Sequence, residues 1–209
     1  MTKKENLSYE NGNSARSERS KKIKKEVIEY AKVLAAAAVL AVLIMVFVAR
    51  SFYIDGRSME PNYHDGQRIM AEKISYRFTS PKRGDVVVFS PQHEPGSKFI
   101  KRVIGVVGDK VEVKERKVYI NDVEISEPYI LMETLWNYGP VVVPEGTVFV
   151  MGDNRNNSQD SRSDEVGMVS LKSIEGKGLF TYWPFNQMGI VKHYRDYPVE
   201  IDQRIQSEN

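Results

Sequence analysis

Cysteine is absent from the 209-residue sequence. Its absence excludes disulfide bonds, thiolate metal sites and a cysteine nucleophile. Any domain outside the cytoplasm must therefore be stabilised by its packed core alone. The formal net charge is only +2, too small to indicate a nucleic-acid-binding protein. Charged residues (28%) and apolar residues (41%) occur at proportions near those of soluble domains.

Histidine, the usual general base of hydrolases, is also scarce. The three histidines are His64 in a turn-like stretch, His93 in a polar loop and His193 near the C-terminal tail. Their neighbours predict surface or turn positions for all three. Their spacing fits no metal site, so we expect neither a metal nor a cofactor.

Long apolar runs are limited to one, over residues 33–49, which has no polar side chain. As a helix it would extend about 25 Å, just enough to cross a bilayer when Lys32 and Arg50 reach the interface. Residues 1–25 carry eight basic side chains against three acidic ones, which favours a cytoplasmic N-terminus. We expect a single-pass anchor in the cell membrane, with the rest of the chain outside.

A cleaved signal peptide is the alternative for this segment, because Ala49-Arg50-Ser51 fits a loose small-x-small pattern. Signal-peptide cores are usually about 7–15 residues long, and this run is longer. Cleavage there would also leave Ser58 close to a new terminus. We therefore favour an uncut anchor.

Helical periodicity is missing after residue 54, where short β-like runs are separated by turn residues. Alternation between residues 111 and 125 is typical of a half-exposed antiparallel sheet, and Asn121-Asp122 predicts a tight hairpin turn. The fold is predicted to be mainly β, an antiparallel sheet or barrel-like catalytic domain behind one N-terminal transmembrane helix. The predicted strands cover residues 68–73, 85–89, 99–107, 110–114, 117–120, 123–125, 147–151 and 179–182.

Four segments follow from this pattern. A basic cytoplasmic arm covers residues 1–25, and the anchor helix with its flanks covers residues 26–52. The extracytoplasmic all-β domain covers residues 53–194, and a polar tail covers residues 195–209.

The most informative stretch is Asp55-Gly56-Arg57-Ser58-Met59-Glu60-Pro61. A hydroxyl such as that of Ser58 is a weak nucleophile unless a neighbouring base accepts its proton. Lys101 stands among apolar residues of a predicted core strand, and a buried lysine amine has a lowered pKa that suits it to that role. The alternative is a lysine on an edge or outer face of the strand.

Residues 152–162 form a polar run directly after the apolar residues 148–151. Such a run could hold a lysine amine in place and brace a site through Asp–Arg pairs. It could equally be a rigid polar loop without chemistry.

Several stretches together resemble the type I (leader) signal peptidase family, over roughly residues 25–194. Ser58-Met59-Glu60-Pro61 resembles its nucleophile motif, and residues 83–89 resemble its conserved strand. Lys101-Arg102-Val103-Ile104-Gly105 with Gly108-Asp109 resembles the lysine motif, residues 152–162 the last motif, and residues 182–186 a common ending. The short distance between the last two motifs is similar to that in Gram-positive enzymes. Asn62 and Val107 depart from the family, which usually has threonine and proline there.

The resemblance implies a serine–lysine dyad, with Ser58 as nucleophile and Lys101 as general base. It implies that Ser158 orients the lysine amine, and that Asp153 and Asp160 form supporting ion pairs with Arg102 and Arg162. Gly56 stands where some relatives have an oxyanion-hole serine, which leaves backbone N–H groups, chiefly that of Ser58, to bind the oxyanion.

The implied substrates are preproteins with signal peptides cut after small-x-small, bound as an added β-strand beside the lipid bilayer. Ile54, Ile69 and Ile100 are the candidate pocket residues, with Gly56 beside them. The sequence carries no signal for an oligomeric state. Two other interpretations are a non-catalytic, membrane-tethered β-module and a self-cleaving repressor-type protease, which the absence of DNA-binding helices disfavours.

Overall fold

The computed structural model describes residues 22–40, 42, 49–94 and 96–195. The chain divides into two compact units, Met1–Phe47 and Val48–Asn209. In the first unit residues 22–40 and 42 are helical. No helix of the described residues is both long and apolar enough to span a membrane. Residues 41 and 43–48, which belong to the predicted anchor, lie outside the described residues.

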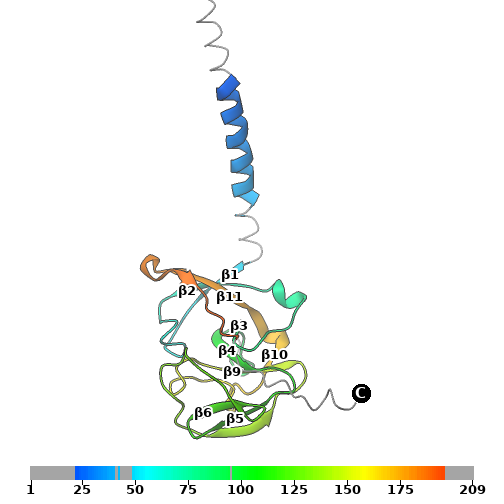
Figure 1. Cartoon of the computed structure of the whole chain (residues 1–209), viewed down its shortest axis with the longest axis vertical. Helices are drawn as coiled ribbons and strands as arrows, with labels where there is room; N and C mark the ends of the chain where they lie inside the picture. The colour runs from blue at the N-terminus through cyan, green and yellow to red at the C-terminus, as the bar shows by residue number, and fades with distance from the viewer. Residues whose placement is uncertain (1–21, 41, 43–48, 95, 196–209) are drawn as a thin grey trace, which may run out of the picture. The chain divides into compact units, whose positions relative to one another are not determined.

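The second unit is built from two antiparallel sheets (Figure 1). In the described part of the chain the larger sheet has the strand order β1-β2-β11-β3-β4-β9-β10, with β12 paired to β11, and the smaller sheet has the order β7-β6-β5-β8. The strands of the larger sheet are β1 (Ala49–Tyr53), β2 (Arg68–Glu72), β3 (Val86–Phe89), β4 (Phe99–Gly105), β9 (Thr147–Met151), β10 (Val169–Ser170), β11 (Ile174–Trp183) and β12 (Gly189–Ile190). Those of the smaller sheet are β5 (Lys110–Lys114), β6 (Lys117–Ile120), β7 (Val123–Glu124) and β8 (Tyr138–Val142). Three short 3₁₀ turns complete it: η1 (Ser75–Arg77), η2 (Leu171–Ser173) and η3 (Phe185–Gln187).

The prediction of a mainly β, antiparallel fold is confirmed. The predicted tight turn is also present: Asn121 and Asp122 both have positive φ, 54° and 69°, and join β6 to β7. The predicted strand over 99–107 ends two residues earlier, because the Val106 N–H bonds to Asp109 Oδ2 in the following turn.

Some strands were not predicted from the sequence. β1 pairs with β2 along its whole length, so Ala49–Tyr53 belongs to the sheet although most of it was assigned to the anchor and its flank. β11 begins five residues earlier than predicted, and β8 was missed. The short strands β10 and β12 were missed as well.

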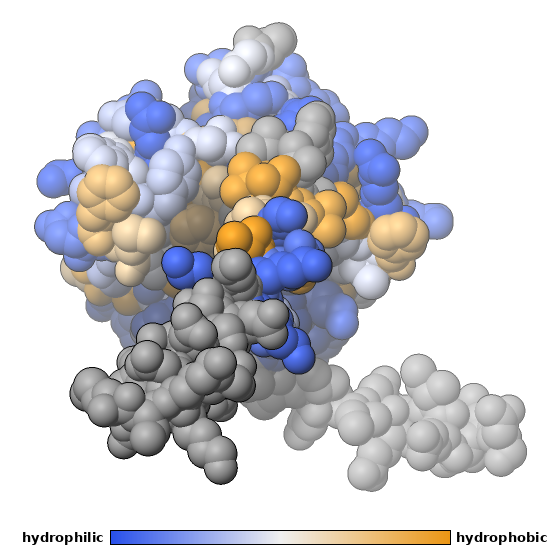
Figure 2. Space-filling view, turned by 90° about the horizontal axis from the view of Figure 1, so that it is seen from above, coloured by the Kyte–Doolittle hydropathy of each residue, from blue (hydrophilic) through white to orange (hydrophobic). Residues whose placement is uncertain are grey.

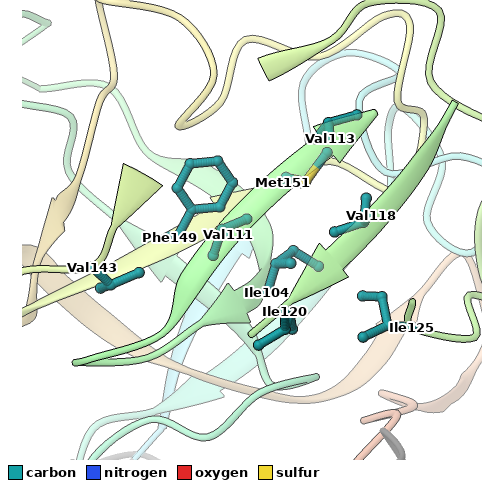
Figure 3. Packing of buried hydrophobic residues seen from close by; sticks show 9 residues of the cluster. All are labelled: Ile104, Val111, Val113, Val118, Ile120, Ile125, Val143, Phe149 and Met151. Carbon is teal, nitrogen blue, oxygen red and sulfur yellow. The ribbon is translucent and has the colours of Figure 1, made fainter. Parts of the chain in front are cut away.

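Three apolar clusters fill the second unit. One lies between the smaller sheet and strands β4 and β9, and its nine buried side chains are drawn in Figure 3. A glycine is required at position 105 for this packing, because a Cβ there would lie 2.6 Å from Val111 Cγ2. A second cluster, around Ile54, Ile69, Val88 and Ile100, lies beneath the loop that carries Ser58. The third packs on β3, β4, β9 and β11. On the face seen in Figure 2, hydrophobic residues form separate patches among hydrophilic ones.

Candidate active site

Ser58 lies in a tight loop between β1 and β2. The loop is closed at its base by Ile54 N–H to Gln67 O (2.8 Å) and by Gly66 N–H to Ile54 O (3.0 Å). Gly56 has a φ of 92°, and its N–H donates to Asp65 Oδ1 at 2.9 Å. Met59 and Tyr63 are buried in the apolar cluster below. The loop is therefore fixed by its backbone and by two anchoring side chains, and Ser58 stands at its turn.

Lys101 lies on β4, between β3 and the polar residues that follow β9. Its side chain is 4% exposed, so the alternative of an outward-facing edge lysine is wrong. Its Nζ lies 2.8 Å from Ser58 Oγ and 3.0 Å from Ile100 O, and 5.1 Å from the centre of the Phe99 ring. Burial lowers the pKa of Lys101 from 10.5 to about 8, against the opposing charges of Asp160 and Asp153. A substantial fraction of the amine is therefore neutral at mildly alkaline pH.

Residues 152–162 hold the backbone of the Ser58 loop. Asn154 N–H donates to Ser58 O at 3.0 Å, and its side-chain amide donates to Arg57 O at 3.2 Å. Gly152 leaves no room for a side chain, because a Cβ there would lie 2.4 Å from Ser58 O. The polar run thus packs against the loop that carries Ser58.

Two buried ion pairs brace this arrangement. Arg102 is fully buried and binds both carboxylate oxygens of Asp153, at 2.8 and 2.7 Å. Arg162 binds Asp160 in the same way, at 2.8 and 2.9 Å, and Gly152 N–H donates to Asp160 at 2.9 Å. Burial alone would raise the pKa of Asp160, but the hydrogen bonds and charge of Arg162 outweigh it and hold that pKa below its usual value.

Ser158 was expected to orient the Lys101 amine. Its hydroxyl is buried and lies beside Gly152, but within the described residues no hydrogen bond joins it to Lys101. The orienting role of Ser158 stays a prediction.

A cleft of about 620 Å³ opens in front of Ser58 and Lys101. Ile54, Gly56, Ile69 and Ile100, the four residues expected at the substrate pocket, all line it. Residues 51–58 and 97–101 supply most of its lining, and Val88, Glu94, Asn157 and Gln159 complete it. The lining therefore combines apolar side chains with polar and charged ones.

The histidines do not contact Ser58 within the described residues. His64 is about half exposed and lies 3.9 Å from Glu60, and His93 is exposed. The prediction of a surface or turn position is wrong for His193. Its Nδ1 accepts from Val86 N–H at 3.2 Å, and its Nε2 donates to Gly178 O at 3.0 Å. Its position was missed because its partners are distant in sequence.

A further group of side chains holds the site in place, and no sequence pattern indicated it. Asn62 donates to Asp153 at 2.9 Å and to Tyr129 O at 2.6 Å, which ties the Ser58 loop to the Arg102 ion pair. Arg155 is buried against Glu127, and its Nε donates to Gly152 O at 3.0 Å. These contacts join segments up to 91 residues apart, so no local spacing could reveal them. No cluster of metal-ligating side chains exists among the described residues.

Comparison with known proteins places this chain in a family. Residues 27–183 match the family model described as signal peptidase, peptidase S26. The chain belongs to the signal peptidase family. It is a peptidase, as the sequence motifs predicted, and Ser58, Lys101 and the residues of the two ion pairs lie within the matched range.

Relatives from two bacterial groups support the assignment. A signal peptidase I of Bacillus amyloliquefaciens is 40% identical over 184 residues, which cover 83% of this chain and 97% of that protein. A probable signal peptidase I of Synechocystis is 40% identical over 78% of this chain and 77% of its own length. A crystal structure of a signal peptidase I from Enterococcus faecalis aligns with a TM-score of 0.42 at 33% identity, covering 47% of this chain and 97% of that one.

Proposed function

We propose that this protein is a membrane-anchored serine endopeptidase that removes signal peptides from preproteins by a Ser58–Lys101 dyad. The observation that carries the proposal is the 2.8 Å approach of a buried lysine amine to a serine hydroxyl, in a cleft that Ile54, Ile69 and Ile100 also line. The family of the chain and the names of its relatives, which are signal peptidases, agree with this substrate class.

The proposed reaction begins with neutral Lys101. Its amine accepts the Ser58 proton as Oγ attacks the scissile carbonyl, and the resulting ammonium then protonates the leaving amine. The same amine afterwards activates water, which hydrolyses the acyl-enzyme and releases Ser58. Burial disfavours the ammonium form, which increases the fraction of Lys101 that is neutral and able to accept the proton.

The developing oxyanion needs a hydrogen-bond donor near Ser58. The Ser58 N–H makes no hydrogen bond with the described residues, whereas the Ser58 carbonyl is held by Asn154. Gly56 offers no side chain, so we assign the oxyanion contact to the backbone, chiefly to the Ser58 N–H.

Substrate would bind along β4. One edge of β4 pairs with β3 over residues 99–102, while β9 pairs with the other edge only from Arg102 onward. Phe99, Ile100 and Lys101 therefore present an edge without a strand partner in the described structure, and that edge faces the cleft. An extended peptide laid there would gain main-chain hydrogen bonds as an added strand.

Selection of small residues before the cut would follow from the packed apolar wall. Ile54, Ile69 and Ile100 are each less than 10% exposed and fill the floor beside Ser58. Little volume is left for a large substrate side chain, and extra volume in a filled pocket costs affinity. Ile100→Ala should admit larger residues at the first or third position before the cut.

Anchoring belongs to this proposal as well. The apolar run 33–49 would hold the enzyme at the cell membrane, with the second unit outside, where emerging preproteins present their cleavage sites. A single-pass topology also fits the basic residues of the N-terminal arm.

The test is cleavage of a synthetic preprotein by the purified full-length chain in detergent, with N-terminal sequencing of the product. Cleavage after small-x-small should occur in the wild type and fall at least about 10³-fold in Ser58→Ala and Lys101→Ala. His64→Ala is the matched control and should retain most activity. Equal activity in the Lys101→Ala variant would refute the dyad, and no cleavage by the wild type would favour a non-catalytic binding module.

A further inference from the structure

The segment from Val191 to Arg195 lies beyond the part of the chain that matches the family model, which ends at residue 183. The sequence predicted only the end of the domain and a polar tail here. The structure instead places residues 191–195 across the larger sheet, next to both halves of the candidate active site. We refer to these five residues as the 191–195 segment.

One set of contacts connects this segment to the Ser58 loop. Lys192 N–H donates to the Tyr63 hydroxyl at 3.1 Å. Tyr63 is 5% exposed, and its own N–H donates to Met59 O, next to Ser58, at 3.0 Å. Val191 is buried in the same apolar cluster as Met59 and Tyr63. The segment therefore supports the loop from the side opposite the cleft.

A second set connects the segment to β4, which carries Lys101. The Lys192 carbonyl accepts from Arg102 Nη1 at 3.0 Å. The Arg102 guanidinium lies 4.3 Å from the Tyr129 ring centre and 5.2 Å from that of Tyr194, and the two ring centres are 5.0 Å apart. Lys192 thus binds the Ser58 side through its N–H and the Lys101 side through its carbonyl.

The segment is itself fixed at several points. Val191 N–H donates to Leu179 O on β11, and Arg195 binds Asp85 at 2.9 Å. Gly84 has no room for a side chain, because a Cβ there would overlap the Tyr194 carbonyl at 1.6 Å. Such close packing is not expected of a loose tail.

We propose that the 191–195 segment is a positioning element of the active site, which holds the Ser58 loop and β4 at the separation that the dyad needs. The proposal deepens the proposed function and rests on it for its kinetic consequences. None of the five residues lines the cleft, so the segment acts on the placement of the reacting groups and leaves substrate contacts unchanged. Small misplacements of reacting groups are costly, up to about 10²-fold in rate for an error near 1 Å.

Two C-terminal truncations distinguish the contribution of the 191–195 segment from that of the residues that follow it. A chain ending at Arg195 should cleave the synthetic preprotein at the wild-type rate. A chain ending at Ile190 should show a kcat lower by roughly 10- to 100-fold, with a KM within about threefold of wild type. Thermal unfolding followed by circular dichroism establishes that each chain is folded at the assay temperature.

A paired substitution guards against simple misfolding. Tyr194 contributes its ring to the stack on Arg102, so Tyr194→Phe should keep full activity while Tyr194→Ala loses about tenfold or more in kcat. Equal activity of the Phe and Ala variants would overturn the proposal.

A readout independent of turnover is the titration of the Lys101 amine, followed by competitive acetylation and mass spectrometry across pH. The groups that face this amine are the Ser58 hydroxyl, the Ile100 carbonyl, the Phe99 ring and the charges of Asp153 and Asp160. Loss of the segment should let water reach the amine and raise its apparent pKa. Unfolded chains would raise it as well, so the titration is made under conditions in which circular dichroism shows the variant to be folded. An unmoved pKa in the chain ending at Ile190 and in Tyr194→Ala overturns the proposal. Because acetylation needs no catalysis, this result stands even if the wild type fails to cut preproteins, a failure that would refute the proposed function alone.

Discussion

Lys101 occupies an environment that most lysines avoid, since its side chain is almost fully buried and no carboxylate of the described residues binds its amine directly. Asp153 and Asp160 act on it only at longer range, because Arg102 and Arg162 occupy their oxygens. The ion pairs therefore engage both carboxylates and leave Lys101 without a partner that would restore its ordinary pKa.

This environment predicts the pH dependence of cleavage. The proposed reaction requires the neutral amine, so kcat/KM should rise with pH through about 8 and level off above it. Lys101→Arg should be inactive at every accessible pH, because arginine keeps its proton. Initial rates on a peptide substrate from pH 6 to pH 10 check both points. A flat profile, or near wild-type cleavage by the arginine variant, would contradict Lys101 as the base.

The same lysine should lower stability at neutral pH. The shift of its pKa from 10.5 to about 8 corresponds to about 3 kcal/mol of unfavourable free energy for the charged form. Between these two values the unfolded chain binds more protons than the folded one, so the stability contributed by Lys101 rises with pH across this range. Lys101→Met should therefore be at least as stable as wild type at pH 7, and its advantage should shrink between pH 8 and pH 10.5. Urea unfolding at three pH values, with Lys172→Met as an exposed control, measures the difference.

Sequence reasoning was most successful where the type of a residue and its neighbours leave few possible roles for it. A serine before a proline and a lysine in an apolar strand predicted the pair that the structure brings together. Asn62 and Tyr63 follow the same motif, but their contacts to Asp153 and to Lys192 depend on chain segments about 90 and 130 residues away. Pattern alone could not show that they support the site.

At the scale of elements, glycine and proline account for the failure to predict β8 and the start of β11. β8 contains Gly139-Pro140, a dipeptide that usually indicates a turn. β11 begins with a stretch containing Gly176 and Gly178, which weaken any β pattern. Gly176 is needed there because a Cβ would lie 2.9 Å from the Glu72 carbonyl oxygen of the neighbouring strand. The cause is close packing of backbones, a tertiary effect that single-sequence patterns do not contain.

His193 makes the attachment of the 191–195 segment sensitive to acid. Burial, followed by the charge of Lys177, lowers the pKa of His193 from 6.5 to about 4. The neutral ring accepts the Val86 N–H through Nδ1, and a proton on that atom would remove the acceptor. Since the unfolded chain binds this proton at a higher pH, stability should fall as pH decreases from 6.5 towards 4. His193→Gln, which can accept and donate but does not titrate there, should show a shallower decline in melting temperature. Identical slopes in the two proteins would exclude His193 as the source.

At the scale of the whole molecule, the boundary between the two compact units, after Phe47, lies next to strand β1. β1 forms five residue pairs with β2, and Ser51 Oγ lies 2.6 Å from the Tyr182 hydroxyl. The β unit therefore needs residues that the sequence had assigned to the anchor and its flank.

A matched pair of N-terminal deletions tests this division. A chain beginning at Val48 should be folded and cleave a short peptide within about threefold of the full-length rate, because the reacting groups all lie in the second unit. A chain beginning at Ile54 lacks β1 and part of the cleft wall, and should lose several degrees in melting temperature and most activity. Equal stability of the two chains would show that β1 is dispensable. Inactivity of the longer chain, with or without lipid, would assign chemistry to the first unit.

Lys101 and Arg102 are adjacent cations on β4 with opposite requirements. In the proposed mechanism Lys101 must be able to lose its proton beside Ser58, whereas Arg102 must keep its proton beside Asp153. The pleat of the strand separates them, because successive side chains point to opposite faces. A deletion of one residue ahead of Lys101 would move Arg102 to the position of Lys101 and present a permanently charged guanidinium to the serine. The position of Lys101 along β4 is therefore as important for the proposed chemistry as the identity of the residue. We expect β4 to tolerate small changes in length far less than conservative substitutions.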